Sequence, residues 1–317
     1  MSEITPDPQT PADPQRATPP ANPFAATHTA AAERGTKRAM IWIAAALVAL
    51  LFTGLMVWYT TVQLRGGSDT TGAASTAEAP GGSDEATAVE WPANLATGGI
   101  VFVERDGAVD LLPSDAPSGN AVPAPVDAAG IGAQHHIRVY LDYRCPFCSL
   151  FEEANADTLE EAVLQGGSAV EIHPLTFLDR VSAGSAYSSR AAGAIECVAD
   201  AQPEATWEAH QALLAQSFQP KEGIAGHDNA ALIAELDRAT GGLNNDARSC
   251  IEQERFVPFA QALNDWSFAN PVRGAKEAGL KVTGTPFVLV DGVPYPGDPE
   301  DPEAFRAFLT QQGVSLG

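Results

Sequence analysis

Hydrophobic and polar positions divide the chain into parts of different character. Residues 39–64 form an unbroken apolar run without a charged side chain. After residue 98, shorter apolar runs recur with alternating or helical periodicity, as in a folded domain. Residues 1–38 and 65–90 show neither pattern and are rich in small and turn-forming residues. The pattern predicts a disordered tail over 1–38, a flexible linker over 65–90 and a folded domain over 91–317.

The apolar run predicts a single transmembrane helix. A helix over 39–64 would be about 39 Å long at roughly 1.5 Å per residue, which is enough to span a bilayer with some tilt. A cleavable signal peptide is the alternative, but its apolar region is usually about 7–15 residues long. Arg34, Lys37 and Arg38 precede the run, against Arg65 after it. The positive-inside rule therefore predicts a cytoplasmic N-terminus and an external domain.

The first half of the domain alternates between strand and helix patterns. Residues 98–112 alternate around a central Asp-Gly, which predicts a β-hairpin. Residues 135–143 and 169–178 each predict a strand. The helix between them is expected to begin at Pro146, since proline suits the first helical position. Strand, helix and strand in this order predict a parallel pair with a right-handed crossover.

The second half begins with helical patterns and returns to strands. Residues 183–269 predict a block of helices separated by Pro, Gly or Asn, with Pro258 interrupting the last of them. A short helix is expected over 271–278. Residues 281–295 predict strands joined by an Asp-Gly turn, and Asp301 is expected to cap the final helix. The domain is therefore expected to be of the α/β class, with a helical block between its two strand-containing parts.

Composition narrows the possible functions. The chain has 18 basic and 40 acidic side chains, and no basic cluster of the kind that binds nucleic acid. We interpret the acidity as keeping an exported domain soluble. All four cysteines lie in the external part, where disulfides form and persist. Three pairings are possible, and the simplest joins Cys145 to Cys148 and Cys197 to Cys250.

Cys145 and Cys148 form a Cys-X-X-Cys pair at a predicted strand-to-helix junction. Thiol–disulfide exchange needs a thiolate, and a helix N-terminus lowers the pKa of a thiol located there. We therefore predict that Cys145 is the nucleophile and that Cys148, one turn later, resolves the mixed disulfide. An inert bridge is the alternative, although the three-residue step is strained. A zinc site would need a second close pair, and Cys197 and Cys250 are 53 positions apart.

The segments "LDYRCPFCSLFEE" and "VTGTPFVLVDG" resemble the two signature regions of DsbA-like thiol-disulfide oxidoreductases. The resemblance covers roughly residues 98–312 and implies a thioredoxin-like fold with an inserted α-helical domain. It places the thioredoxin halves at about 98–182 and 270–317 and the insertion at about 183–269. Similar membrane-anchored forms occur in high-GC Gram-positive bacteria. The family needs no cofactor, and no metal site is expected.

The resemblance also implies roles for residues around the cysteine pair. In the family a cis-proline lies beside the redox disulfide, and Thr285 with Pro286 matches that motif. A cis bond there would leave backbone groups free to pair with a substrate strand, whereas an ordinary edge-strand proline is the alternative. Pro146 and Phe147 are expected to tune the couple. Many DsbA-type oxidases carry histidine in place of Phe147, and threonine before the cis-proline also occurs in the isomerase branch.

Asp142, three positions before the first cysteine, has two interpretations. It could pass protons during exchange, as buried acids do in thioredoxin relatives, or hydrogen-bond a turn at the strand end. Glu152 and Glu153 are expected on a solvated helix face. His135 and His136 are expected at the surface.

The remaining candidate residues are interpreted as structural. His173 and His210 have no cysteine or acid at ligand spacing. Cys197 and Cys250 are expected to form a structural disulfide between the first and last long helices of the block. A second redox pair and the absence of any bridge are the alternatives. A stability difference without a change in activity would distinguish the structural role.

These features predict a membrane-tethered oxidase that introduces disulfides into exported proteins. A quinone-linked membrane partner of the DsbB or vitamin K epoxide reductase type would re-oxidise it. A reductase or isomerase of the cell envelope is the alternative, and a non-enzymatic envelope binding module is a third possibility. No dimerisation element is evident, and the linker over 65–90 is no helical stalk, which favours a monomeric oxidase.

Overall fold

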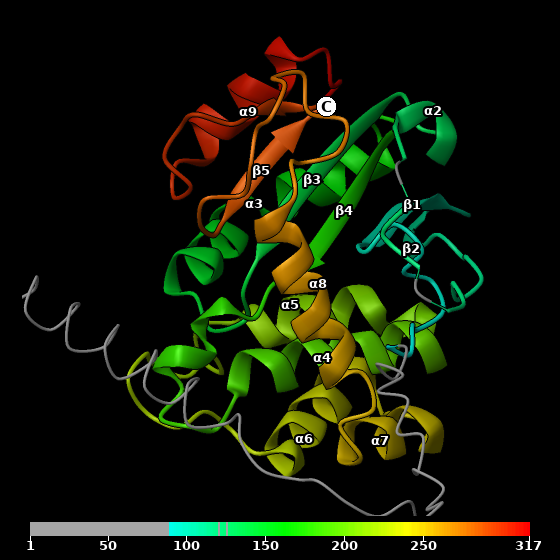
Figure 1. Ribbon diagram of the computed structural model, residues 1–317. Helices are drawn as coiled ribbons and strands as arrows, with labels where there is room; N and C mark the ends of the chain where they lie inside the picture. Colours follow the sequence, from blue (N-terminus) through cyan, green and yellow to red (C-terminus); the bar gives the residue numbers. More distant parts are fainter. Residues whose placement is uncertain (1–88, 120, 125) are drawn as a thin grey trace, which may run out of the picture. The chain divides into compact units, whose positions relative to one another are not determined.

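The computed structural model describes residues 89–317 except 120 and 125 (Figure 1). The predicted tail, the predicted span over 39–64 and nearly all of the predicted linker lie outside the described residues. No helix in the described part of the chain combines the length and the apolar character needed to cross a membrane.

A mixed six-stranded sheet with the order β2-β1-β4-β3-β5-β6 forms the centre of the domain. The predicted parallel pair is confirmed: β3 runs parallel to β4, while β1 and β5 are antiparallel to their neighbours β4 and β3. The predicted first hairpin is also confirmed, since β1 pairs with β2 around an Asp-Gly turn. The strands are β1 (Ile100–Arg105), β2 (Ala108–Leu111), β3 (His135–Leu141), β4 (Ser168–Pro174), β5 (Phe287–Val290) and β6 (Val293–Pro294).

One face of the sheet packs against helices α3 (Pro146–Leu164) and α9 (Pro302–Gln311). Side chains alternate along a strand, so the apolar residues of β3 and β4 at every second position share this face. They join one core cluster with Phe151 of α3 and Phe305 of α9, whose rings meet edge to face at 5.3 Å. As predicted, Asp301 caps α9 by accepting a hydrogen bond from the backbone N–H of Ala304. This packing fixes α3 against the sheet.

The opposite face of the sheet carries a buried polar cluster. Glu171 of β4 lies 2.8 Å from His136 Nε2, 2.9 Å from Arg138 Nε and 3.2 Å from His173 Nε2. The expectation that His136 lies at the surface was wrong, because it is only 6% exposed. Strand alternation points it to this second face, where helix α2 (Ala128–Ile131) and the chain before β5 add cover. The buried ion pair between Arg138 and Glu171, with the two histidines beside it, therefore explains why these strands carry polar residues at buried positions.

A block of helices lies between β4 and β5, gathered at one end of the sheet (Figure 1). Pro258 interrupts the last predicted helix, as expected, because α8 begins one residue before it. Residues 215–228 form an irregular loop, which is longer than the break between helices that the sequence predicts at this place. The block comprises α4 (Tyr187–Ala201), α5 (Thr206–Leu214), α6 (Asn229–Thr240), α7 (Asn245–Glu252) and α8 (Val257–Ala269), with short 3-10 turns η1 (Phe177–Val181) and η2 (Pro203–Ala205) before α4 and α5.

The short helix predicted over 271–278 was also wrong, because this segment forms turns instead. Gly274 and Gly279 both adopt positive φ angles, of 72° and 81°, which end helical geometry. The backbone N–H of Lys276 donates to the carbonyl of Gly292 at 2.9 Å, in the β5–β6 turn. A Cβ at Gly292 would come within 2.1 Å of the Gly274 carbonyl, so this close approach requires glycine.

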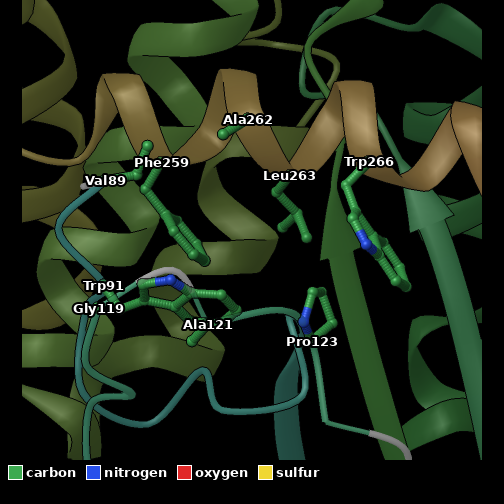
Figure 2. Close-up of a pocket in the computed structure, with 9 residues that line it drawn as sticks. All are labelled: Val89, Trp91, Gly119, Ala121, Pro123, Phe259, Ala262, Leu263 and Trp266. Carbon is green, nitrogen blue, oxygen red and sulfur yellow. The ribbon is translucent and has the colours of Figure 1, made fainter. Parts of the chain in front are cut away.

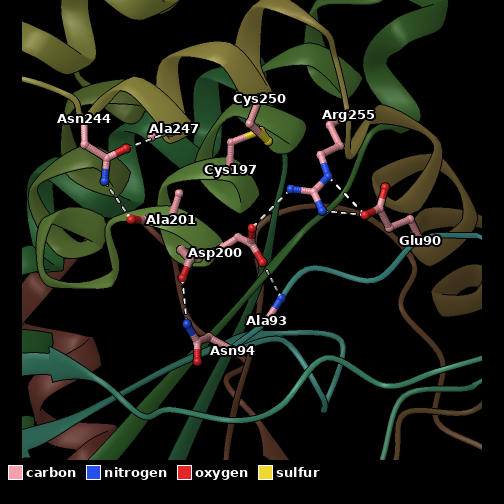
Figure 3. A network of polar contacts seen from close by, with 11 residues as sticks. Glu90, Ala93, Asn94, Cys197, Asp200, Ala201, Asn244, Ala247, Cys250 and Arg255 are labelled. Carbon is pink, nitrogen blue, oxygen red and sulfur yellow. Dashed lines mark hydrogen bonds and ion pairs between the residues drawn. A yellow bond between two sulfur atoms is a disulfide. The ribbon is translucent and has the colours of Figure 1, made fainter.

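A disulfide joins Cys197 of α4 to Cys250 of α7, with the two Cα atoms 5.7 Å apart. The sequence predicted Cys250 in the last long helix of the block, but it lies in α7, because the chain turns between α7 and α8. The first described residues are fastened beside this bridge (Figure 3). Arg255 pairs with Glu90 at 2.5 Å, and Asp200 of α4 accepts a hydrogen bond from the Ala93 N–H at 2.7 Å. The bridge and these contacts hold the start of the domain to the helical block.

Replacing both bridged cysteines with alanine is expected to destabilise the domain without changing its redox chemistry. The bridge closes a loop over a separation of 53 positions, for which loop entropy gives about 4 kcal/mol of unfolding free energy. Denaturant unfolding of the Cys197→Ala/Cys250→Ala variant and of the oxidised wild type measures the difference. Loss of thiol-exchange activity at unchanged stability would instead show a second redox pair.

Candidate active site

The junction between β3 and α3 places Cys145 at the start of a helix. Cys145 is the N-cap residue, and Pro146 occupies the first turn as the sequence predicts. The backbone N–H of Cys145 donates to the carbonyl of Asp142 at 2.9 Å, which closes the turn before the helix. The N–H groups of Cys148 and Ser149 then donate to the Cys145 carbonyl at 3.0 and 3.2 Å. These bonds direct the free N–H groups of the first helical turn toward the Cys145 thiol.

Both cysteines of the pair are reduced and buried. Cys145 is 4% exposed and Cys148 is 1% exposed, while Phe147 between them is 55% exposed. The Cys145 Sγ lies 3.4 Å from the carbonyl oxygen of Thr285, which the fold brings in from 140 positions away. The Thr285–Pro286 peptide bond is cis. The structure thus brings together the cysteine pair and the loop before β5, the two segments that the sequence singled out.

The surroundings of Cys145 favour its thiolate. The Cys148 thiol, which hydrogen-bonds to the Cys145 sulfur, is the largest cause that lowers the pKa of Cys145, to about 6. Burial opposes this effect, while the Thr285 side chain and the backbone N–H groups of Cys148 and Phe147 support it. The Thr285 hydroxyl has no other hydrogen-bond partner among the described residues, so it is available to donate to the thiolate. Cys145 is therefore mostly ionised at neutral pH.

The pKa values of Cys148 and Asp142 are raised, in contrast to that of Cys145. Burial raises the pKa of Cys148 well above that of an ordinary thiol, and the neighbouring Cys145 raises it further. Burial also raises the pKa of Asp142 to about 7, against the hydrogen bonds that its carboxylate accepts. Those bonds come from the backbone N–H groups of Arg144 and Leu178, at 2.9 and 3.0 Å. A thiolate therefore lies beside a neutral thiol, which is the pairing that thiol–disulfide exchange requires.

Sequence reasoning missed Arg144, directly before the first cysteine. Its side chain is fully buried, and its guanidinium donates to the carbonyl oxygens of Lys221 and Ile224 and, at 3.2 Å, to the Ser182 hydroxyl. The Lys221 and Ile224 carbonyls belong to the loop over 215–228. Nothing in the local sequence signals these contacts, because the partners lie 38 to 80 positions away.

Gln219 of the same loop was also missed. Its side-chain amide donates to the carbonyl oxygens of Tyr143 and Cys145, at 3.2 and 3.0 Å. Hydrogen bonds therefore hold the loop to the junction from both sides: Arg144 donates to the loop, and Gln219 of the loop donates to the junction.

A buried polar chain lies behind the junction. The Tyr143 hydroxyl is 2.9 Å from His210 Nδ1 on α5, and His210 Nε2 is 3.5 Å from a Glu152 carboxylate oxygen on α3. The expectation that Glu152 lies on a solvated face was wrong, since it is 5% exposed. The helical block covers this face of α3 with α5. Glu153, one residue later, is exposed as predicted.

Two cavities lie near the cysteine pair, and a third lies at another place in the domain. One of about 250 Å³ is lined by Pro146 and one of about 430 Å³ by Glu152, and both include Ser149 and Gln216. An apolar pocket of about 230 Å³ lies between the first described residues and α8, and none of the cysteines lines it (Figure 2). Among the described residues, no group of three or more His, Cys, Asp or Glu side chains is arranged to hold a metal ion.

Comparisons with known proteins agree with this geometry. The family model described as Thioredoxin matches residues 131–311. The serine/threonine-protein kinase PknE of Mycobacterium tuberculosis is 34% identical over 155 residues, which is 48% of this chain and 26% of that protein. The chain therefore matches about a quarter of the length of this curated relative.

Two solved structures from Mycobacterium tuberculosis are similar over most of the domain. The reduced form of the disulfide bond oxidoreductase DsbG superposes with a TM-score of 0.51 at 25% identity, covering 69% of this chain and 89% of that one. Reduced DsbA gives the same TM-score and identity, and covers 69% of this chain and 94% of that one. The chain belongs to the thioredoxin family, and its described domain is of the DsbA-like thiol-disulfide oxidoreductase type.

Proposed function

We propose that Cys145 and Cys148 form the redox couple of this protein and that it acts as an oxidase, introducing disulfides into exported proteins. The observation that carries this proposal is the position of Cys145 at the N-terminus of α3, next to Cys148 and 3.4 Å from the Thr285 carbonyl, where the surroundings lower its pKa to about 6. Stabilising the thiolate stabilises the reduced form of the couple, and this makes the disulfide form a stronger oxidant.

In the proposed reaction, a substrate thiolate attacks the Cys145 sulfur of the disulfide form. The bond to Cys148 breaks, and Cys148 leaves with the electron pair and takes up a proton. A second substrate thiolate then attacks the substrate sulfur of the mixed disulfide, and Cys145 leaves as a thiolate. The substrate gains one disulfide, and the couple gains two electrons. A low pKa makes Cys145 a good leaving group in this last step.

The loop at Thr285 and Pro286 is the proposed binding site for the substrate backbone. Its Thr285 carbonyl lies 3.4 Å from the nucleophilic sulfur, so a peptide held there would present its own sulfur to Cys145. Phe147 offers an exposed aromatic ring beside the pair, suited to the apolar segments of an unfolded chain. Pro146 and Phe147 provide no charge at the pair, and Asp142 is the proposed tuning acid beneath it.

The predicted anchor would hold the domain outside the cytoplasmic membrane, where newly exported chains appear. After each reaction the reduced couple must be re-oxidised. We propose a quinone-linked membrane thiol oxidase of the DsbB or vitamin K epoxide reductase type as that partner, on the basis of the family resemblance. A reductase or isomerase of the envelope is the competing function, and the reduction potential distinguishes the two.

The reduction potential of the couple is expected to be less negative than that of thioredoxin. Equilibrating the full chain with glutathione buffers and measuring the oxidised fraction gives the value. The stabilised Cys145 thiolate predicts a potential shifted from about −270 mV toward the value of about −120 mV found in DsbA. A value near about −270 mV, as in thioredoxin, would contradict the oxidase and favour the reductase.

Alkylation of Cys145 in the reduced protein is expected to follow a midpoint near pH 6. Its folded-state pKa is lowered to about 6, so the rate should rise through that pH and level off above it, whereas an unshifted thiol would keep gaining reactivity up to about pH 9. Cys148→Ala removes the largest stabilising hydrogen bond and should move the midpoint upward. Cys148→Ser keeps a donor and should stay closer to the wild type. A wild-type midpoint above pH 8 would contradict the assignment.

Asp142→Asn is expected to lower the alkylation midpoint and to remove a pH dependence from the stability of the reduced protein. The amide removes a negative charge near Cys145. The folded-state pKa of Asp142 is raised to about 7, so ionising this carboxyl group lowers the free energy of unfolding as the pH rises from about 4 to 7. The neutral amide has no such cost, although it cannot accept both backbone hydrogen bonds that the carboxylate accepts. Denaturant unfolding and the alkylation profile measure the two effects separately. An upward shift of the midpoint would show that the charge of Asp142 does not reach the thiolate.

A further inference from the structure

Glu152 is a buried acid for which the exchange reaction, as described above, has no role. It lies in the second turn of α3, four positions after Cys148. Residues at this spacing share one face of a helix, with Cβ atoms about 5–6 Å apart. Both side chains are covered by the core, since Cys148 is 1% exposed and Glu152 is 5% exposed. The resolving thiol and a carboxyl group are therefore neighbours inside the protein.

The Glu152 carboxylate lacks the partners that a buried charge normally has. Neither oxygen makes a hydrogen bond within the described residues, and both are shielded from solvent. The nearest donor is His210 Nε2 at 3.5 Å, which is an ion-pair contact too long for a good hydrogen bond. Leaving a buried carboxylate unpartnered is costly, so a purely structural role does not explain this residue.

Glu152 also borders a route to solvent. Its side chain lines the cavity of about 430 Å³ together with Ser149, Gln211, Leu214 and Gln216. This volume is large enough for several water molecules.

Cys148 needs a partner for its proton. Burial and the neighbouring thiolate raise the pKa of Cys148 well above that of a free thiol, so it is protonated at rest. It must lose that proton whenever it attacks and regain one whenever it leaves. Asp142 is a second acid near the pair, with a pKa raised to about 7, but both of its oxygens accept backbone hydrogen bonds that hold its carboxyl group at the turn.

We propose that Glu152 carries the proton of Cys148 to and from the cavity, and that His210 and Tyr143 position its carboxyl group. This inference rests on the proposed Cys145–Cys148 couple. In the resolving step, Cys148 gives its proton to the Glu152 carboxylate, and its sulfur attacks Cys145. A Cys145–Cys148 disulfide forms, the bond from Cys145 to the substrate sulfur breaks, and that sulfur leaves as a thiolate with the electron pair. Glu152 then releases the proton to water in the cavity.

The charged and titratable groups around this path come from several elements. His210 faces Glu152 from α5, and Tyr143 faces it from the β3–α3 junction. Burial raises the pKa of Tyr143 well above its ordinary value, and negative charge on Glu152, Glu196, Tyr187 or Cys148 raises it further. Tyr143 therefore stays protonated, and its hydroxyl holds the orientation of the His210 ring through their 2.9 Å contact.

Stopped-flow oxidation of the reduced full chain by oxidised glutathione tests the proposal. The slope at low glutathione reports attack by Cys145, and the plateau at high glutathione reports resolution by Cys148. Glu152→Gln is expected to lower the plateau by about 100-fold and leave the slope unchanged, since general acid–base groups contribute at least that much. Asp157→Asn, which changes an exposed acid of α3 outside the lining of this cavity, should alter neither. A Glu152→Gln plateau within twofold of the wild type would overturn the proposal.

Chemical rescue separates proton transfer from a structural role. Glu152→Ala enlarges the cavity, so added formate should restore the plateau with a saturable dependence on formate concentration. A plateau that formate does not change would overturn proton transfer by Glu152. Tyr143→Phe should shift the pH midpoint of resolution while leaving that of Cys145 alkylation unchanged. If wild type, Glu152→Gln and Asp157→Asn all fail to form a glutathione adduct on Cys145, the couple itself is wrong and both proposals fall.

Discussion

The Asp142 carboxylate fixes the turn on which the chemistry of this domain depends. It accepts hydrogen bonds from the backbone N–H groups of Arg144 and Leu178, and so joins the end of β3 to the start of η1. The same turn makes Cys145 the N-cap of α3. Such hydrogen bonds each contribute about 0.5–1.5 kcal/mol to a neutral acceptor and about 1.5–3 kcal/mol to a charged one, so they hold the turn in both protonation states of Asp142. The N–H groups of the first helical turn then lie where they stabilise the Cys145 thiolate.

Two thiols one helical turn apart consequently meet opposite environments. Cys145 faces donors: the Cys148 thiol, the Thr285 hydroxyl and backbone N–H groups. Cys148 faces the core, and every charge that forms on its neighbour makes its own ionisation harder. These surroundings therefore favour a thiolate at Cys145 and a protonated thiol at Cys148. Cys148 has to lose its proton before it can act as a nucleophile. Proton transfer at the second cysteine becomes the step for which the protein has to provide a group.

Features that depend on neighbouring residues in the sequence could be predicted. Features that depend on elements far away in the sequence packing over a residue could not. The β3-α3-β4 unit followed from alternation, helical spacing and the place of Pro146, all of which act within a few residues. The burial of Glu152 and His136 could not be predicted in this way, because it depends on which distant elements cover helix α3 and the second face of the sheet. The helix expected over 271–278 failed for another reason: its glycines adopt positive φ angles to pack against the β5–β6 turn.

The helical block between β4 and β5 reaches the reaction centre from two sides. From the loop over 215–228, Gln219 holds the carbonyl of Cys145 at 3.0 Å. From α5, His210 contacts both Tyr143 and Glu152. A block that served only to enlarge the domain would not explain a buried histidine that lies between Tyr143, two residues before Cys145, and Glu152, one turn after Cys148. Its position follows if the block supplies the dry surroundings in which a single carboxyl group can control the proton of Cys148.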